Sequence, residues 1–314
     1  KKVIHNKSKI ISNILVFVVA GGSVLAQASE SFDYPLGFGI AASPSMEIST
    51  RHDDNVFLQD DRAPRVGGQA LVKSSWITEL APSIKLVAND GPNQYSAQYT
   101  LTAGRYHSSR DDDLIDHELV LQTHNEFNYR NQLNLEFDYL HLHEKRGTGI
   151  VEDIVGVIKN RVKTPLEYDD IYVAGDYTYG GAESKGRITV KASRLDREYT
   201  NYRDISRFYD RDENALGAIF YYRVMPKTSL LFETGFKDLN YDKTATGIDK
   251  LDGDEQRYEV GVTWEATEKT TGTAQIGKTY KDFDASNRKD RDFTSWAVNV
   301  EWAPLTYSII DISS

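Results

Sequence analysis

From about residue 38 to its end, the sequence repeats short segments in which apolar and polar side chains alternate. The clearest segment is Arg257–Glu265, where Tyr258, Val260, Val262 and Trp264 alternate with more polar residues. Successive side chains of a β-strand point to opposite sides of the sheet, so this segment predicts a strand with one apolar and one ionic face. A soluble sheet would bury the apolar face. A transmembrane barrel would turn it toward lipid and keep the ionic face around water.

The first 28 residues have the pattern of a secretory signal peptide. Four lysines precede the apolar run of residues 14–20, and Ala26-Gln27-Ala28 forms a small-x-small cleavage site. The apolar run is too short for a membrane helix, which needs about 20 residues. We therefore predict that residues 1–28 are a cleaved signal peptide that directs the chain through the inner membrane. Residues 29–314 are the predicted mature domain.

The composition excludes several classes of protein. A mean hydropathy of −0.52 excludes a helical membrane protein, but it is compatible with a barrel, whose strands are only half apolar. The sequence has no cysteine, which excludes disulfides, thiolate metal sites and a lipid attached at the cleavage site. Removal of the four signal lysines takes the formal charge from −10 to −14. This acidity argues against nucleic acid as a partner.

Twelve strand segments follow one another along the chain. They are residues 40–50, 75–88, 94–106, 115–127, 131–143, 167–179, 186–195, 213–225, 228–241, 255–266, 270–281 and 292–302. Globular strands have about 5–6 residues and tilted membrane strands about 9–11, so these lengths favour a membrane barrel. Short turns alternate with long charged loops, as in barrels with short periplasmic turns and longer outer loops. We predict an all-β fold, a transmembrane antiparallel up-and-down β-barrel of the Gram-negative outer membrane.

The complete barrel is predicted to contain more strands than these twelve. Residues 306–314 begin a thirteenth strand. Single-chain bacterial barrels have an even number of strands, and they usually close on an aromatic residue, whereas the last residue here is Ser314. We therefore interpret the chain as C-terminally incomplete. At least twelve strands are present, and about 14 to 18 are expected in all, a size that holds an aqueous channel.

The alternation assigns a face to each side chain. The predicted lipid-facing side chains are Leu80, Ile84, Leu86, Tyr95, Ala97, Tyr99, Leu101, Leu133, Leu135, Phe137, Tyr139, Ile188, Val190, Ala192, Leu230, Phe232, Phe236, Trp296, Val298, Val300 and Trp302. The predicted lumen-lining side chains are Glu79, Lys85, Gln98, Asn134, Glu136, Asp138, Arg187, Lys191, Glu233, Lys237, Arg257, Glu259 and Glu301. A cation facing lipid at the midplane costs about 2–4 kcal/mol, so these charges are expected to face water. Aromatic residues near strand ends, such as Tyr221 and Tyr222, suit an interfacial belt.

Residues 144–166 depart from the strand pattern. The spacing of Ile154, Val157, Ile158 and Val162 is weakly helical. A short helix, a loop that folds into the lumen as a constriction, and a plain loop with a few buried aliphatic residues all fit this composition. We favour the plain loop.

Groups that could support catalysis or metal binding are few. His141 and His143 share a strand face and His124 lies on the preceding strand, so three imidazoles could bind zinc. Their places on opposite faces favour histidines at the barrel rim instead. Acidic loop clusters, such as Asp111–Asp113 and residues 249–255, could take calcium, but solvated charge is the better interpretation. No Ser–His spacing points to hydrolysis. We predict no catalytic residue, no cofactor and no metal site, and therefore no enzyme.

Three segments carry a resemblance to a known family. Ser45–Phe57 ends in Asp54-Asn55-Val56-Phe57, and it is followed by Trp76–Ile84 and by the tyrosine-rich residues 95–99. These segments resemble the β-barrel porins that are encoded in exopolysaccharide and capsule gene clusters, the putative β-barrel porin 2 family. The resemblance implies an outer-membrane barrel associated with export or assembly of a surface polysaccharide. It also implies periplasmic and inner-membrane export proteins as partners, and it transfers no catalytic residue.

Three functions remain open at this point. The first is a conduit or accessory in polysaccharide export, surrounded by outer-membrane lipid and lipopolysaccharide. The second is a general or solute-specific diffusion porin. The third is a structural or adhesive barrel with a plugged lumen. The mixture of charged, amide and tyrosine side chains on the predicted inner wall suits a hydrophilic solute such as a sugar.

Overall fold

The structure is a computed structural model that describes residues 34–58, 74–151, 162–181, 183–244, 251–267, 270–305 and 308–313. The chain divides into two units, residues 1–31 and 32–314, and all the described residues belong to the second. The predicted signal peptide therefore lies outside the described residues, and its cleavage stays a prediction.

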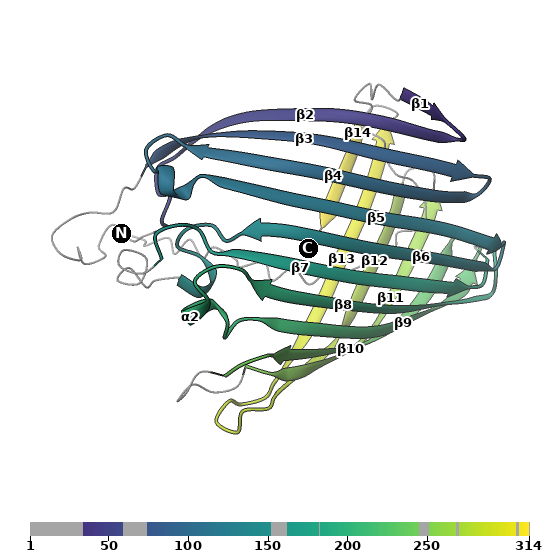
Figure 1. Ribbon diagram of the computed structural model, residues 1–314. Coiled ribbons are helices and arrows are strands. Elements are labelled where there is room, and N and C mark those ends of the chain that lie inside the picture. The colour runs from purple at the N-terminus through teal and green to yellow at the C-terminus, as the bar shows by residue number, and fades with distance from the viewer. Residues whose placement is uncertain are drawn as a thin grey trace. The chain divides into compact units, whose positions relative to one another are not determined.

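The second unit is a single antiparallel sheet of 14 strands, in which each strand pairs with its neighbours in sequence (Figure 1). The strands are β1 (Tyr34–Gly37), β2 (Ile40–Asp53), β3 (Ser75–Asp90), β4 (Asn93–Tyr106), β5 (Leu114–Asn128), β6 (Asn131–His143), β7 (Glu167–Tyr179), β8 (Gly186–Tyr199), β9 (Arg211–Met225), β10 (Thr228–Tyr241), β11 (Gly253–Thr267), β12 (Thr270–Phe283), β13 (Arg291–Leu305) and β14 (Ser308–Ser313). The predicted all-β, up-and-down fold is confirmed. Among the described residues β1 and β14 are not paired with each other, so the sheet is not closed.

The twelve predicted strand segments correspond to β2–β13, and the predicted thirteenth corresponds to β14. The sequence pattern missed β1. It also ended β8 at residue 195, four residues before Tyr199. The outward positions of this last part of β8 carry Arg194, Asp196 and Glu198, so the apolar period stops while the backbone ladder with β7 continues.

Turns and loops lie at opposite ends of the sheet (Figure 1). The turn from β3 to β4 contains only Gly91 and Pro92, and Gly91 supplies the positive φ of 60° that tight hairpins need. At the turn from β5 to β6, the Arg130 amide donates to Asn128 Oδ1 at 3.0 Å. The long loops at the other end contain a 3-10 helix at Arg110–Asp112, another at Gly149–Val151 and the short helix α2 at Arg203–Ser206. Within the described residues, no helix has the length and apolar character to cross a membrane.

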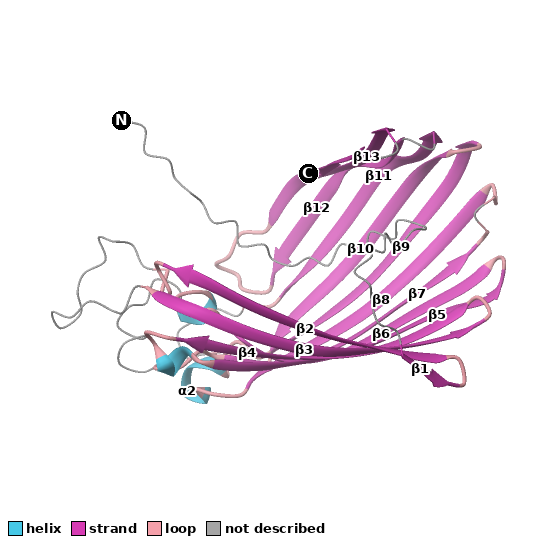
Figure 2. Ribbon diagram, turned by 90° about the horizontal axis from the view of Figure 1, so that it is seen from above, coloured by secondary structure: helices cyan, strands magenta, loops and turns pink. Residues whose placement is uncertain are grey.

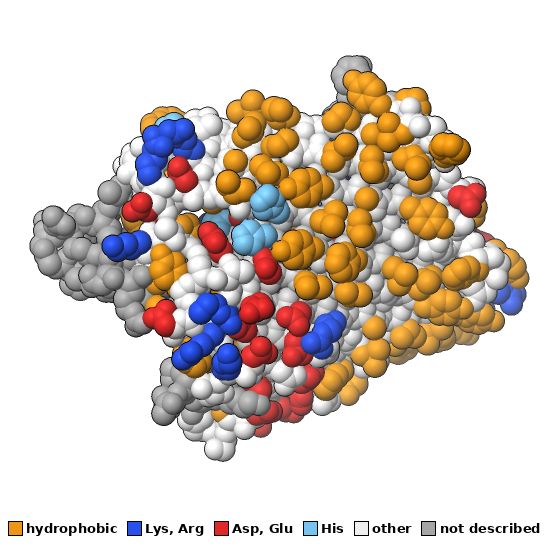
Figure 3. Space-filling view, viewed as in Figure 1, with side chains coloured by type: hydrophobic (Ala, Val, Ile, Leu, Met, Phe, Trp, Pro, Cys, Tyr) orange, Lys and Arg blue, Asp and Glu red, His pale blue; other side chains and the backbone are white. Residues whose placement is uncertain are grey.

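The two faces of the sheet differ in polarity. The register aligns Ile84, Tyr99, Leu119, Tyr139 and Ile171 across β3–β7 in one row. The sheet is strongly curved (Figure 2), and the space-filling view of the convex side of β2–β10 shows a broad band of apolar side chains there (Figure 3). The predicted lipid-facing side chains occupy the positions of this face. The other face is concave.

Two glycines on the concave face allow neighbouring strands to approach closely. A side chain at Gly261 of β11 would collide with the carbonyl oxygen of Ala274, and one at Gly277 of β12 would collide with that of Tyr258. Glycine in a strand interior often marks a tight bend of this kind. A Cβ atom at either position would therefore force the neighbouring strand to shift.

Candidate functional site: a polar concave face and a loop cap

All thirteen predicted lumen-lining residues occupy positions of the concave face. The cross-strand register connects them in sequence across the sheet, from Glu79 and Lys85 on β3 to Glu301 on β13. Because alternate residues of a strand face opposite sides, none of the thirteen shares a face with the apolar band. Their role in lining a water-filled lumen stays a prediction.

Side chains on the concave face of β10–β13 form a hydrogen-bonded network. Arg257 Nη2 lies 3.1 Å from Glu233 Oε1. Gln275 Nε2 donates to the other oxygen of Glu233 at 3.0 Å, and Ser295 Oγ donates to Glu259 Oε1 at 2.8 Å. The network links four strands, so it fixes the positions of charged groups on this part of the wall.

Charge is segregated around the concave face. Strands β5, β6 and β7 contain no Lys or Arg. We call the carboxylates on their concave positions the acidic wall: Asp116, Glu118, Glu126, Glu136, Asp138, Asp170 and Asp176. The next strand, β8, has Arg187, Lys191 and Arg197 on the same face. At the boundary between the two strands, Arg197 Nη2 lies 2.6 Å from Asp170 Oδ2. The wall therefore changes from acidic to basic between β7 and β8.

One predicted belt residue lies on the concave face instead. Tyr221 packs against Arg187, whose Cζ is 4.3 Å from the centre of the tyrosine ring. Tyr222 lies on the convex face, as predicted, with Lys185 Nζ 4.9 Å from its ring centre. Adjacent residues of a strand point to opposite faces, so only one of the two tyrosines can belong to an interfacial belt. The prediction for Tyr221 was wrong.

Several long loops fold together at one end of the sheet. We call residues 54–58, 109–113, 144–151, 162–166 and 200–210 the loop cap. Its buried apolar core consists of Val56, Phe57, Ile150, Val162 and Leu166, packed with Ile77, Tyr106, Leu114 and Tyr199 of the strand ends. These four strand residues occupy concave positions. The loop cap therefore packs onto the concave side of the strand ends rather than extending away from the sheet.

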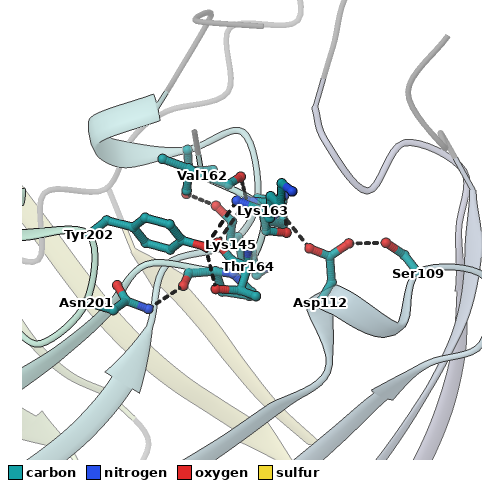
Figure 4. Close-up of polar contacts among 11 residues, drawn as sticks. Ser109, Asp112, Lys145, Val162, Lys163, Thr164, Asn201 and Tyr202 are labelled. Atoms are coloured by element: carbon teal, nitrogen blue, oxygen red, sulfur yellow. Dashed lines mark hydrogen bonds and ion pairs between the residues drawn. The ribbon is translucent and has the colours of Figure 1, made fainter. Parts of the chain in front are cut away.

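Arg146 is the central polar residue of the loop cap. Its Nε lies 2.6 Å from Asp112 Oδ1, and both side chains are buried, at 6% and 1% exposure. Its guanidinium also donates to three carbonyl oxygens of the returning segment, those of Val162, Lys163 and Thr164, at 2.8 to 3.0 Å. Asp112 accepts a further hydrogen bond from Ser109 (Figure 4). One side chain thus joins the two ends of the β6–β7 loop to the β4–β5 loop.

Tyr202 holds the same segment from the opposite side (Figure 4). Its hydroxyl oxygen accepts hydrogen bonds from the amides of Lys163 and Thr164, at 3.1 and 3.0 Å. Next to it, Asn201 donates to the Pro165 carbonyl at 2.9 Å. Tyr202 has a left-handed backbone with φ 48°, immediately before α2. This strained conformation directs its side chain to the amides of the 162–166 segment.

The comparison with known families gives one match. The family model described as "Putative beta-barrel porin 2" matches residues 39–312. This chain belongs to that family. The match starts just before β2 and ends within β14, so it includes both the acidic wall and the loop cap of this porin-family barrel.

No curated protein matches the chain. Among solved structures, it is similar to the outer-membrane expressed OmpT of Vibrio cholerae, with 10% sequence identity and a TM-score of 0.44. The alignment covers 85% of this chain and 98% of that one. A score this low informs neither the fold nor the function of the barrel.

In the described parts of residues 144–166, Gly149–Val151 is a 3-10 helix and the rest is loop, with Ile150 and Val162 as buried aliphatic residues of the loop cap. The weakly helical residues Ile154, Val157 and Ile158 lie outside the described residues. The acidic clusters are less solvated than predicted, because Asp112 and Asp252 are both 1% exposed. Asp112 is buried beside Arg146 of another loop, and Asp252 accepts hydrogen bonds from the Tyr241 and Asp284 amides, contacts that alternation alone does not report.

The three histidines considered for zinc have different partners. His124 donates to Asn134 Oδ1 at 2.6 Å, His141 to Asp169 Oδ1 at 2.6 Å and His143 to Asp116 Oδ1 at 2.8 Å. His143 is the last residue of β6 at a position on the same face as His141, and its ring bonds to Asp116, which occupies a concave position of β5. In the part of the chain that the structure describes, no group of three or more His, Asp or Glu residues could hold a metal ion.

We predict that Glu144 makes the stability of the loop cap depend on pH. Burial raises the pKa of this carboxyl above its ordinary value of 4.5, although Tyr199 and the Ile150 amide, which both donate to it, oppose the shift. A pKa that is raised in the folded state contributes stability that is complete below about pH 4.5 and is lost as the pH rises through the folded-state pKa. We expect hydrogen-exchange protection factors of the loop cap to fall as the pH rises from about 4.5 through the folded-state pKa of Glu144. Glu144→Gln should make the protection of the loop cap less dependent on pH. The same pH dependence in this variant would contradict the assignment of the effect to Glu144.

Proposed function

We propose that this protein is a non-enzymatic outer-membrane barrel whose concave face encloses a water-filled passage. We further propose that it serves the export or assembly of an exopolysaccharide or capsular polysaccharide. The proposal rests on the distribution of apolar and polar side chains between the two faces of the sheet, in a chain that belongs to a porin family. Every strand from β3 to β13 places apolar residues on the convex face, while charged and amide residues cover the concave face. Lipid outside and water inside would satisfy both faces.

The composition of the concave wall supports a carbohydrate as the solute. Tyr172 and Tyr221 supply aromatic rings on this face, while Gln98 and Asn134 supply amides that bind hydroxyl groups. The export role itself derives from the family resemblance. The partners we propose are the polysaccharide, periplasmic and inner-membrane export proteins, and outer-membrane lipid with lipopolysaccharide.

A diffusion porin is the second candidate, and the charge segregation favours it. An acidic wall on β5–β7 beside a basic β8 creates a field across the passage, and rings of charge set selectivity in pores. Such a wall would act on small ions and polar nutrients as well as on a glycan. A plugged barrel is the third candidate, because the loop cap covers the concave side of several strand ends.

Current through planar lipid bilayers separates the three candidates. We expect the purified protein to conduct, and an added acidic polysaccharide to block the current. Conduction that no glycan affects would support the diffusion porin, and no conduction at all would support the plugged barrel. Replacing Glu118, Glu136 and Asp138 by Gln, Gln and Asn should reduce the preference for potassium over chloride in a salt gradient. Asp238→Asn, on the convex face, should leave that preference unchanged.

A further inference from the structure

A line of polar side chains crosses the convex face where the apolar band ends on the loop side. The register places His117 of β5 directly opposite His141 of β6, and His141 directly opposite Asp169 of β7. Tyr99 of β4 lies on the same face, with its hydroxyl 2.7 Å from His117 Nδ1. Histidine and acidic side chains lie at this border in the view of the convex side (Figure 3). The porin function described above gives none of these four residues a role.

The hydrogen bonds of the two imidazoles use the same ring nitrogen. His117 Nδ1 bonds to the Tyr99 hydroxyl, and His141 Nδ1 donates to Asp169 Oδ1 at 2.6 Å. With a proton on Nδ1, each ring keeps the lone pair of Nε2 for another partner. Histidine ligands of metals almost always donate their second N–H to a carboxylate or another oxygen, which fixes the tautomer and the ring orientation. The Asp169 carboxylate gives His141 this support, and the Tyr99 hydroxyl gives it to His117 in the tautomer that carries the proton on Nδ1.

The separation of the two rings suits one shared ion. Their centres are 6.1 Å apart and their planes are inclined by 47°. With a Zn–N bond of about 2.1 Å, each ring centre lies about 3 Å from the metal, so two ligating rings have centres about 5 to 6 Å apart. The side chains are accessible, at 28% exposure for His141 and 34% for Asp169.

We propose that His117 and His141 form a surface site for a divalent transition metal ion, with Zn²⁺ and Cu²⁺ as the preferred ions. Tyr99 and Asp169 act as positioning residues that hold the two rings. Imidazole suits Zn²⁺ and Cu²⁺, whereas Ca²⁺ and Mg²⁺ prefer sets of oxygen ligands. Water would complete the coordination. The site lies at the loop-side end of the strands, within reach of ions in the outer medium.

Calorimetric titration of the folded protein in detergent, purified without a polyhistidine tag, tests this site. We expect one equivalent of Zn²⁺ to bind, and Cu²⁺ to bind more tightly as the Irving–Williams order requires. His117→Gln and His141→Gln should each weaken binding at least tenfold. Asp169→Asn should weaken it about 10- to 100-fold through loss of its support. His52→Gln is the matched control and should bind as the unchanged protein does.

Two results would overturn the site. One is equal binding by the His117→Gln/His141→Gln double variant, and the other is equal competition by Ca²⁺, which would assign the ions to carboxylates. A measurement on the unchanged protein guards against variants that fold poorly. Zn²⁺ should protect His117 and His141, but not His52, from acylation by diethyl pyrocarbonate, as mapped by mass spectrometry. Equal modification of all three with and without Zn²⁺ would contradict the proposal.

Discussion

Val190→Lys is expected to lower the free energy of unfolding from a lipid bilayer by about 2–4 kcal/mol, the cost of a cation near the midplane of a barrel surface. Val190 is 42% exposed on the convex face, in the middle of the outward apolar positions of β8. Its neighbours across the strands are Tyr177 and Ala218, so no carboxylate is opposite a new ammonium group. Urea titration of the protein folded in phospholipid vesicles measures the change.

Ser193→Lys is the matched control for this substitution. Ser193 lies three residues further along the same strand on the concave face, where Lys191 already carries an ammonium group. If the concave face meets water, the new lysine should change the free energy of unfolding by no more than about 0.5 kcal/mol, as for most surface substitutions. Equal costs for the two variants would mean that the convex face does not contact lipid.

Arg146→Ala is expected to open the loop cap while the sheet stays folded. Removing one partner of a buried ion pair typically costs about 3–5 kcal/mol, because it leaves an uncompensated buried charge, here on Asp112. Arg146 makes no contact in the ladders between strands. The hydrogen-exchange protection of amides in residues 162–166 should therefore fall by about two to four orders of magnitude, while that of β10 and β11 stays unchanged.

Two further variants make the Arg146 result specific. Arg110→Ala removes an exposed arginine from the same loop cap, and it should leave the protection of residues 162–166 unchanged. The double variant Arg146→Met/Asp112→Leu removes both buried charges and should recover part of the loss, since apolar replacements of a buried pair are often tolerated. Full protection in Arg146→Ala would show that the apolar core alone holds the loop cap. Loss of protection in β10 would show that the sheet depends on it.

The sequence by itself determined the strands, their faces and the class of fold. Alternation is a property of neighbouring residues, so the opposite environments of Val190 and Lys191 can be read without knowing which strands pair. The ends of the strands were less certain. At Arg194–Glu198 the outward residues become polar although the backbone pairing of β8 continues. The family resemblance at Ser45–Phe57 was readable for the same local reason.

Only the tertiary structure decided which distant residues meet. The burial of Asp112 beside Arg146, and the closure of 162–166 by Tyr202, join loops that have no common period in the sequence. The opposition of His117 and His141 depends on the register of β5 and β6, which the geometry of their connecting turn sets. Local patterns specify the direction of each side chain. Contacts between loops and between strands depend on how the whole sheet brings those side chains together.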